Sequence, residues 1–229
     1  MKRRTVIIIV VIMTCPVALW FLARALNWIV FYTPATVSME PTIRADRKIM
    51  GSCFAEAGRG DVVSYRTPDS ASIVMKLDDV FLSRIVAVAN DKVEIRKGIL
   101  YVNDKCADDT MNLGYFFAVN TGAIPPGLLA LKEKVFPYSD TSSIVNASYN
   151  EMKKTGLLLK GKRIMDLQTI PAKQFKPGAG DRTFTEDNFG PVRVPEGFMF
   201  LMSDNRSNSV DSRVIGFIPR KNLIAKIFL

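Results

Sequence analysis

The sequence contains no histidine and only three cysteines among its 229 residues. Without imidazole, the chain cannot build a Ser-His-Asp triad, a Cys-His dyad or a zinc site that uses histidine. It also lacks any side chain whose unperturbed pKa lies near neutrality. Any acid–base chemistry therefore has to come from lysine, tyrosine, cysteine or a carboxylate.

A run of consecutive basic residues is also missing from the main part of the chain. The formal net charge is +9, but the first 32 residues hold four basic residues and no acidic ones. The remainder has 31 minus 4, or 27, basic residues against 22 acidic ones, a net charge of +5. Because no basic stripe is interleaved with aromatic residues, we expect no nucleic-acid partner. A mild basic excess is equally suited to an anionic lipid surface.

One long hydrophobic run stands out against the rest of the chain. Residues 5–22 carry no charge, and Arg24 follows after one further residue. About 20 apolar residues cross the hydrocarbon core of a bilayer, and Trp28, Phe31 and Tyr32 suit the aromatic belt at its edge. Three basic residues before the run place the N-terminus in the cytoplasm. We therefore predict that residues 1–32 form a cytoplasmic stub and a single transmembrane anchor, with the rest of the chain exported.

A cleavable secretory signal is the alternative explanation of this run. Such signals have apolar regions of about 7 to 15 residues followed by a site of small residues. The run here is longer, although Thr33-Pro34-Ala35 offers a weak cleavage site. Cleavage there would leave a secreted protein without an anchor.

In the part expected to be exported, the residue pattern predicts a series of short strands separated by turns. The stretch from Lys92 to Asn103 alternates in polarity around Lys97-Gly98, which predicts a hairpin. One short helix is expected over residues 147–157. Residues 104–190, rich in proline, glycine and polar residues, are expected to form an inserted β-rich lobe between the two parts of a β core, 33–103 and 191–229. Apolar or alternating segments predict strands at 62–65, 72–75, 81–88, 92–96, 99–103 and 198–202.

Two cysteines fall in the exported part. Cys53 and Cys106 can form a disulfide if the compartment is oxidising. Two small buried thiols are an equal alternative. The sequence leaves this choice open.

Two segments concentrate reactive side chains. Ser38-Met39-Glu40-Pro41-Thr42 lies six residues beyond the expected aromatic belt, close to the outer membrane surface. Residues 203–213 contain hydroxyls, carboxylates and guanidiniums directly after an apolar strand. Together with Arg59-Gly60-Asp61-Val62-Val63 and Ser83-Arg84-Ile85-Val86, these segments resemble, in order and spacing, type I signal peptidase, a membrane-anchored serine protease.

The resemblance implies a role for each matching residue. Ser38 would be the nucleophile that attacks the scissile carbonyl, and Thr36 would donate to the oxyanion together with the backbone N–H of Ser38. Ser209 would orient the general base. Further matching positions are Asp211 and Arg213, an ion pair behind the site, and Arg84, Asp204, Asn205 and Arg206, which support it.

One position departs from the family pattern. The family's general base is a lysine immediately before the arginine that matches Arg84, and this chain has Ser83 there. A serine hydroxyl cannot accept the proton of another serine near neutral pH. Lys76 is the nearest upstream amine and is our candidate for a surrogate base, but seven residues of extended chain span about 23 Å. Only a fold-back of the chain would bring it to the site.

The resemblance implies a mostly β fold, with coiled antiparallel sheets behind one N-terminal transmembrane helix. It implies a serine endopeptidase that removes signal peptides from exported preproteins at the outer face of a bacterial cytoplasmic membrane, in contact with the lipid bilayer and without a metal or cofactor. The alternative is a catalytically silent homologue that binds signal-like segments or assists surface assembly. A third hypothesis is a protease that acts on one dedicated partner protein.

Overall fold

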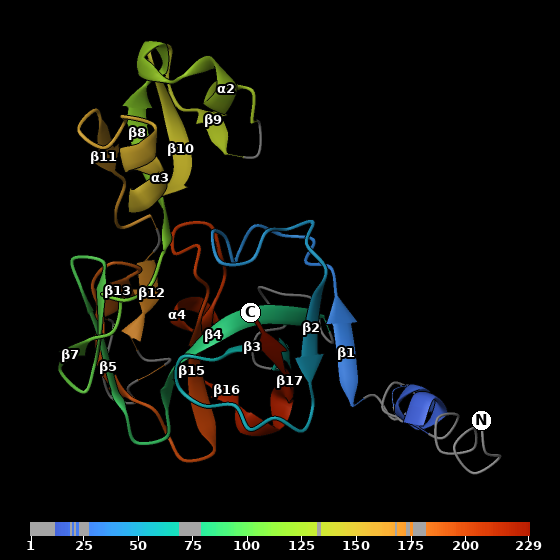
Figure 1. The fold of residues 1–229 in the computed structure, drawn as a ribbon. Helices are drawn as coiled ribbons and strands as arrows, with labels where there is room; N and C mark the ends of the chain where they lie inside the picture. Colours follow the sequence, from blue (N-terminus) through green and yellow to red (C-terminus); the bar gives the residue numbers. More distant parts are fainter. Residues whose placement is uncertain are drawn as a thin grey trace.

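A computed structural model describes most of residues 33–229 and a few residues before them (Figure 1). The described residues are 12–18, 20, 22, 28–68, 79–131, 134–167, 169–172, 175 and 182–229. The expected strand at 72–75 and the candidate base Lys76 lie outside them. Much of the expected anchor, including the basic residues before it, lies outside them as well.

Antiparallel sheets dominate the described residues, which confirms the expectation of a mostly β fold. The first sheet has the strand order β1-β2-β17-β3-β4-β15-β16. Its central strands bring together segments far apart in the sequence, since β4 pairs with β3 on one side and with β15 on the other. Its strands are β1 (Ile29–Tyr32), β2 (Ile49–Ser52), β3 (Val62–Arg66), β4 (Val80–Val88), β15 (Phe198–Met202), β16 (Ile218–Pro219) and β17 (Leu223–Phe228).

A second sheet packs against this one and has the order β14-β5-β6-β7. The predicted hairpin is confirmed, with Val93 opposite Val102 and a turn at Lys97 and Gly98. The core between the sheets contains Val86 and Phe200 from the first sheet and Leu100 from the second. The strands are β5 (Lys92–Arg96), β6 (Ile99–Val102), β7 (Lys105–Cys106) and β14 (Phe189–Arg193).

Strand β15 is apolar along its whole length because both of its faces are buried. Phe200 and Met202 face the second sheet, while Met199 and Leu201 pack on the opposite side with Ile215. Two short helices flank the strands that follow, α4 (Ser212–Ile215) and the 3-10 helix η4 (Arg220–Asn222). The uninterrupted apolar segment that predicted a strand at 198–202 therefore reflects burial on two sides.

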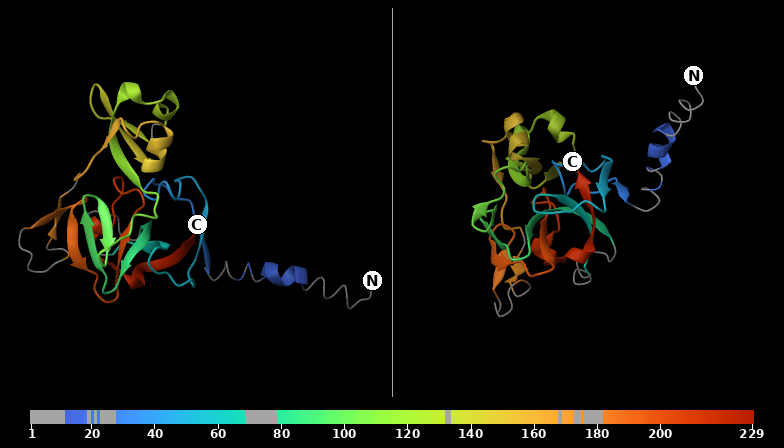
Figure 2. Two further views of the ribbon diagram at one scale, coloured as in Figure 1. Left: turned by 60° about the vertical axis from the view of Figure 1, so that its left-hand side comes forward. Right: turned by 60° about the horizontal axis from the view of Figure 1, so that its bottom comes forward.

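A separate lobe stands above the two sheets in Figures 1 and 2. Its sheet has the order β11-β8-β10-β9, with its own core around Phe117, Val145 and Met152. A two-stranded sheet, β12-β13, follows it in the chain. The elements are β8 (Gly114–Asn120), η2 (Thr121–Ala123), α2 (Pro126–Leu129), β9 (Val135–Pro137), β10 (Ser142–Ser148), α3 (Tyr149–Lys154), β11 (Gly161–Arg163), β12 (Thr169–Pro171) and β13 (Thr183–Thr185).

The helix predicted over 147–157 is shorter than expected. Ala147 and Ser148 belong to strand β10, and the helix α3 ends at Lys154. Ser148 and Glu151 form a capping box that starts the helix, and Gly156, at φ 71°, lies in the left-handed region just beyond its end. The capping residues therefore set the helix limits more tightly than the apolar pattern did.

Two further expectations concern the N-terminus and the cysteines. Within the described residues, no helix combines the length and hydrophobicity needed to cross a bilayer. Cys53 is exposed on the bend after β2, and Cys106 is only partly buried in β7 of the other sheet. They form no disulfide and are not two buried thiols, so neither alternative for this pair holds.

Candidate active site

The turn that carries Ser38 is fastened to the core on both sides of the hydroxyl. The Met39 side chain is buried with Ile43 beneath the turn. The Asn205 backbone N–H donates to the Ser38 carbonyl at 2.9 Å, and the Asn205 side-chain amide donates to the Val37 carbonyl at 3.0 Å. The Ser38 side chain is left partly exposed. The serine is thus held on a fixed turn with its hydroxyl open to an approaching group.

The Thr36 hydroxyl lies beside this serine. Its Oγ1 is 3.1 Å from Ser38 Oγ, within hydrogen-bonding distance. The backbone N–H of Ser38 makes no hydrogen bond with the described residues. The two donors that the resemblance assigns to an oxyanion therefore lie next to the Ser38 hydroxyl, and the backbone N–H is available.

A cavity of about 360 Å³ opens at Ser38. Phe81 and Leu82 from β4 line it, and so does the loop that follows β15. Its wall carries several hydroxyls and no ionisable side chain among the described residues. The lining residues are Thr36, Val37, Ser38, Phe81, Leu82, Ser83, Ser203, Asn208, Ser209 and Val210.

Ser83 occupies the wall of this cavity where the family pattern has lysine. It is 1% exposed, and its hydroxyl donates to the Leu82 carbonyl at 2.8 Å. Its oxygen is also 3.3 Å from Ser203 Oγ, because β4 and β15 pair with Arg84 opposite Met202. Two small hydroxyls thus fill the position of one long amine.

Tyr65 lies behind Ser83 and supplies no substitute for that amine. Its side chain is fully buried, and burial raises the pKa of the phenol, with a partial offset from the Ser83 hydroxyl. A phenol with a raised pKa stays protonated at neutral pH. It therefore cannot accept the proton of Ser38.

Arg84 and Asp204 form an ion pair beneath the site. Arg84 Nε donates to Asp204 Oδ1 at 2.9 Å, and Nη2 donates to Oδ2 at 2.5 Å. The Thr42 hydroxyl donates to the same Oδ2 at 2.5 Å. Asp204 thereby connects the Ser38 segment to β4. Thr42 belongs to the segment Ser38–Thr42 that resembles the family, and no role was predicted for it from the sequence.

Asp211 and Arg213 form a second ion pair, which is fully buried. Arg213 Nε and Nη2 donate to the two Asp211 oxygens at 2.9 and 2.8 Å, and the Ser203 N–H donates to the same carboxylate. Burial alone lowers the pKa of Arg213, but the Asp211 carboxylate outweighs it and raises the pKa. Arg213 therefore stays charged. It sets the path of the loop in which the Ser209 hydroxyl donates to the Asn205 carbonyl at 2.8 Å.

Asp108 is a partner of this loop that was not predicted from the sequence. Arg206 Nη2 donates to Asp108 Oδ1 at 2.8 Å, and the Arg206 carbonyl accepts from Arg213. Asp108 belongs to the loop before the lobe, 98 residues from Arg206. No local pattern distinguishes this aspartate from its exposed neighbour Asp109.

Lys76, the candidate base, lies outside the described residues.

A family model covers almost the whole chain. The model described as "Signal peptidase, peptidase S26" matches residues 3–229. The signal peptidase I of Rickettsia prowazekii (strain Madrid E) is 30% identical over 178 residues, which cover 77% of this chain and 53% of that relative. The signal peptidase I of Aquifex aeolicus (strain VF5) is 29% identical over 209 residues, 86% of this chain and 73% of that protein.

The chain therefore spans about half the length of its Rickettsia relative. Among solved structures, a signal peptidase I from Enterococcus faecalis V583 aligns with 76% of this chain and 98% of its own. The TM-score is 0.37 and the sequence identity is 17%.

Proposed function

This chain belongs to the signal peptidase family, peptidase S26, and on that premise we propose that it is a serine endopeptidase that removes signal peptides from exported preproteins. The observation that carries the proposal is the meeting of Ser38 and Thr36 in one cavity with Ser83, Ser203 and Ser209. These residues come from three separate parts of the chain. A serine on a solvated loop would face water and not a cavity lined with these hydroxyl groups.

In this mechanism Ser38 Oγ attacks the scissile carbonyl carbon, and an acyl-enzyme forms as the amine of the mature protein leaves. The oxyanion accepts hydrogen bonds from the Ser38 N–H and from Thr36 Oγ1, which turns away from Ser38 Oγ to reach it. Water then hydrolyses the ester. The cavity beside Phe81 and Leu82 holds the residue before the cut, next to the Ser38 hydroxyl.

Lys76 is the residue we propose as the base. The connection that contains it leaves the sheet next to the cavity, because Thr67 N–H donates to the Asp79 carbonyl and Phe81 lines the cavity wall. For this role the Lys76 amine has to reach the Ser38 hydroxyl, and Lys76 itself lies outside the described residues. A lysine that is desolvated there has its pKa lowered into the range of a base.

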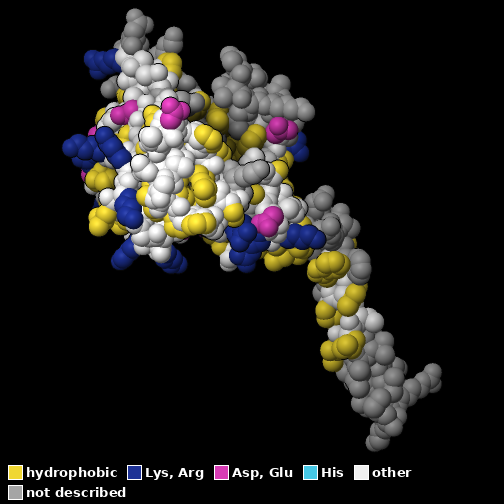
Figure 3. Space-filling model, turned by 90° about the horizontal axis from the view of Figure 1, so that it is seen from above, with side chains coloured by type: hydrophobic (Ala, Val, Ile, Leu, Met, Phe, Trp, Pro, Cys, Tyr) yellow, Lys and Arg dark blue, Asp and Glu magenta, His cyan; other side chains and the backbone are white. Residues whose placement is uncertain are grey.

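We place the catalytic part at the outer face of the bacterial cytoplasmic membrane, in contact with lipid. The charge-free run at 5–22 and the basic residues before it support this orientation. Figure 3 shows hydrophobic side chains along the N-terminal helical segment, where Ile12, Met13 and Val17 are exposed. Trp28 and Phe54, both exposed, meet edge to face with ring centroids 5.0 Å apart close to the start of β1.

A catalytically silent homologue that binds signal-like segments is the second candidate. The pairing of Ser83 and Ser203 favours it, since two neutral hydroxyls stand where a base is needed. A binder of this kind would use the same cavity without cutting.

One experiment separates the two candidates. A preprotein reporter in detergent is incubated with the wild type and with Ser38→Ala, and mass spectrometry locates any cut. We expect the wild type to cut after small residues at positions one and three before the cleavage site, and Ser38→Ala to be inactive. Lys76→Ala, with Lys105→Ala as a control at an exposed lysine, then tests the base. A wild type that binds the reporter but never cuts it would favour the silent homologue.

A further inference from the structure

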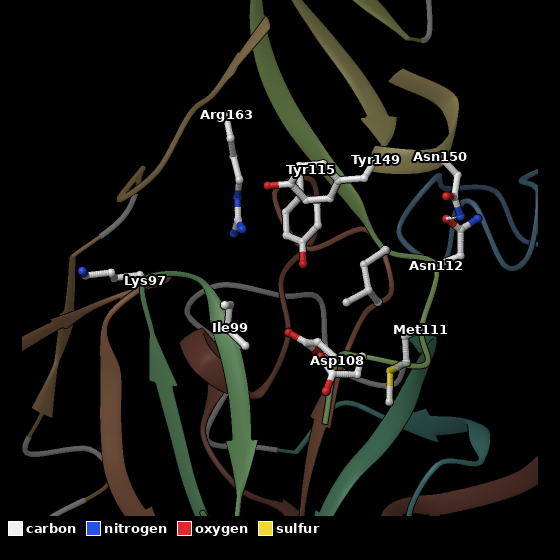
Figure 4. Close-up of a pocket in the computed structure, with 11 residues that line it drawn as sticks. Lys97, Ile99, Asp108, Met111, Asn112, Tyr115, Tyr149, Asn150 and Arg163 are labelled. Atoms are coloured by element: carbon white, nitrogen blue, oxygen red, sulfur yellow. Dashed lines mark hydrogen bonds between the residues drawn. The ribbon is translucent and has the colours of Figure 1, made fainter. Parts of the chain in front are cut away.

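A second cavity, of about 530 Å³, lies where the lobe meets the core (Figure 4). It shares no lining residue with the cavity at Ser38. Sites between two packed parts of a chain are common ligand sites. The lining residues are Lys97, Ile99, Asp108, Asp109, Met111, Asn112, Leu113, Tyr115, Tyr149, Asn150 and Arg163.

Tyr115 is the residue whose side chain most clearly indicates a ligand in this cavity. Its side chain is 5% exposed, and its hydroxyl points into the cavity in Figure 4. This hydroxyl makes no hydrogen bond with the described residues and is open to the cavity, so a ligand there can reach it. The Arg163 guanidinium lies 3.8 Å from the centre of the ring and holds it in place. Burial raises the pKa of Tyr115, so the phenol is a neutral donor.

The basic groups around the cavity are paired within the protein or directed away from it. Arg163 is paired with Asp187 at 2.6 Å, and Asp108 with Arg206 at 2.8 Å. The Lys97 amine points away from the cavity in Figure 4. Asp109 is exposed and accepts a hydrogen bond from the Cys106 thiol. An anionic ligand would therefore meet no unpaired basic group inside, and the site is better suited to a ligand without negative charge.

The remaining lining groups combine donors, acceptors and apolar surface. The rings of Tyr115 and Tyr149 are 5.5 Å apart, and the Asn150 amide donates to Asn112 at the rim, leaving other amide atoms available. Ile99 is an exposed apolar side chain on the opposite wall. A ligand with several hydroxyls matches this mixture, because each hydroxyl both donates and accepts.

We propose that this cavity binds a short neutral oligosaccharide of N-acetylhexosamine units. Sugar hydroxyls accept from Tyr115 and bond to Asn112 and Asn150, while the acetamido methyl groups pack on Ile99. The tyrosine rings provide apolar faces for the sugar ring. The proposal does not depend on peptidase activity, since none of these residues lies at Ser38.

The test uses the full chain in a phosphocholine detergent, which has no sugar headgroup, with N,N′,N″-triacetylchitotriose as the probe in titration calorimetry. We expect saturable binding by the wild type. Tyr115→Phe removes only the unpaired hydroxyl, and we expect it to weaken binding about tenfold, the effect of one hydrogen bond. Tyr138→Phe, at an exposed tyrosine of the same lobe, is the matched control and should bind as the wild type does.

Maltotriose, which lacks acetamido groups, should bind at least about tenfold more weakly than the probe, from the loss of buried methyl surface and amide hydrogen bonds. Equal binding of the two sugars would overturn the assignment to N-acetylhexosamine. Absence of saturable binding, or full affinity in Tyr115→Phe, would overturn the site. Displacement of the sugar by an extended signal-like peptide, with tighter binding of that peptide, would overturn the sugar in favour of a peptide subsite.

Discussion

The hydroxyl oxygens of Ser83 and Ser203 lie 3.3 Å apart, because β4, which contains Ser83, pairs with β15, which ends at Met202 directly before Ser203. This pair occupies the wall of the Ser38 cavity where the family pattern places a lysine amine. An amine introduced there would be desolvated, because Ser83 is 1% exposed, and desolvation lowers the pKa of lysine.

We therefore expect Ser83→Lys, introduced into the Lys76→Ala variant, to raise its cleavage rate by about 10²-fold, within the usual contribution of general base catalysis. The measurement is cleavage of the preprotein reporter at pH 8. Ser83→Met is the control, since its side chain is also long but carries no amine. An equal gain in Ser83→Met would show that the larger side chain, and not a base, causes the effect.

Thr36→Ala is predicted to lower kcat with little change in KM. Loss of one oxyanion donor costs about 2.7 to 4 kcal/mol of transition-state stabilisation, a factor of roughly 10² to 10³. Thr36→Ser keeps a hydroxyl near Ser38 and should retain most of the activity. Because Thr36 is exposed, thermal unfolding of both variants should match the wild type. A rise in KM alone would instead indicate that Thr36 contacts the ground-state substrate.

Asp211→Asn is predicted to reduce the free energy of unfolding by about 3 to 5 kcal/mol, because it leaves the buried Arg213 guanidinium without its countercharge. Urea unfolding of the wild type and the variant measures the difference. Asp46→Asn is the matched control: its pair with Arg44 is exposed, with the two charged atoms 3.7 Å apart, and such pairs contribute about 0 to 1 kcal/mol. Similar losses in the two variants would contradict the role of burial.

Acid is predicted to destabilise the fold through Asp91. Burial by itself raises the pKa of Asp91, but hydrogen bonds from the Val88 N–H, Arg59 and Asn103 outweigh it and hold the pKa below its ordinary value. A carboxylate with a lowered folded-state pKa stabilises the fold above its unfolded pKa of about 3.9. That stability is lost as the pH falls from this value through the lower folded-state pKa.

The free energy of unfolding, measured by urea between pH 2 and 6, should therefore fall more steeply for the wild type than for Asp91→Asn. The variant is expected to be less stable at pH 6 and to approach the wild type at pH 2. Parallel curves would show that Asp91 makes no contribution to the acid sensitivity.

Local features were largely predictable from the sequence. Strands β5 and β15 have the predicted limits, because alternation in one and an unbroken apolar segment in the other depend only on which faces are buried. Helix α3 was predicted too long, since the capping box at Ser148 and Glu151 takes precedence over apolar spacing. The sequence left open whether Cys53 and Cys106 form a disulfide or two buried thiols, and neither is found, because Cys53 lies on an exposed bend after β2 while Cys106 lies in β7 of the other sheet.

By itself, the sequence determined which chemistry is available: a chain without histidine, with Ser38 and Thr36 on one segment and Ser83 before Arg84 on another. Only the tertiary structure decided which of these groups meet. The contact between Ser83 and Ser203 spans 120 residues, and that between Asp108 and Arg206 spans 98. The physical reason is that such contacts arise from strand pairing and burial across the whole chain. No local pattern encodes the partner of a side chain so far away.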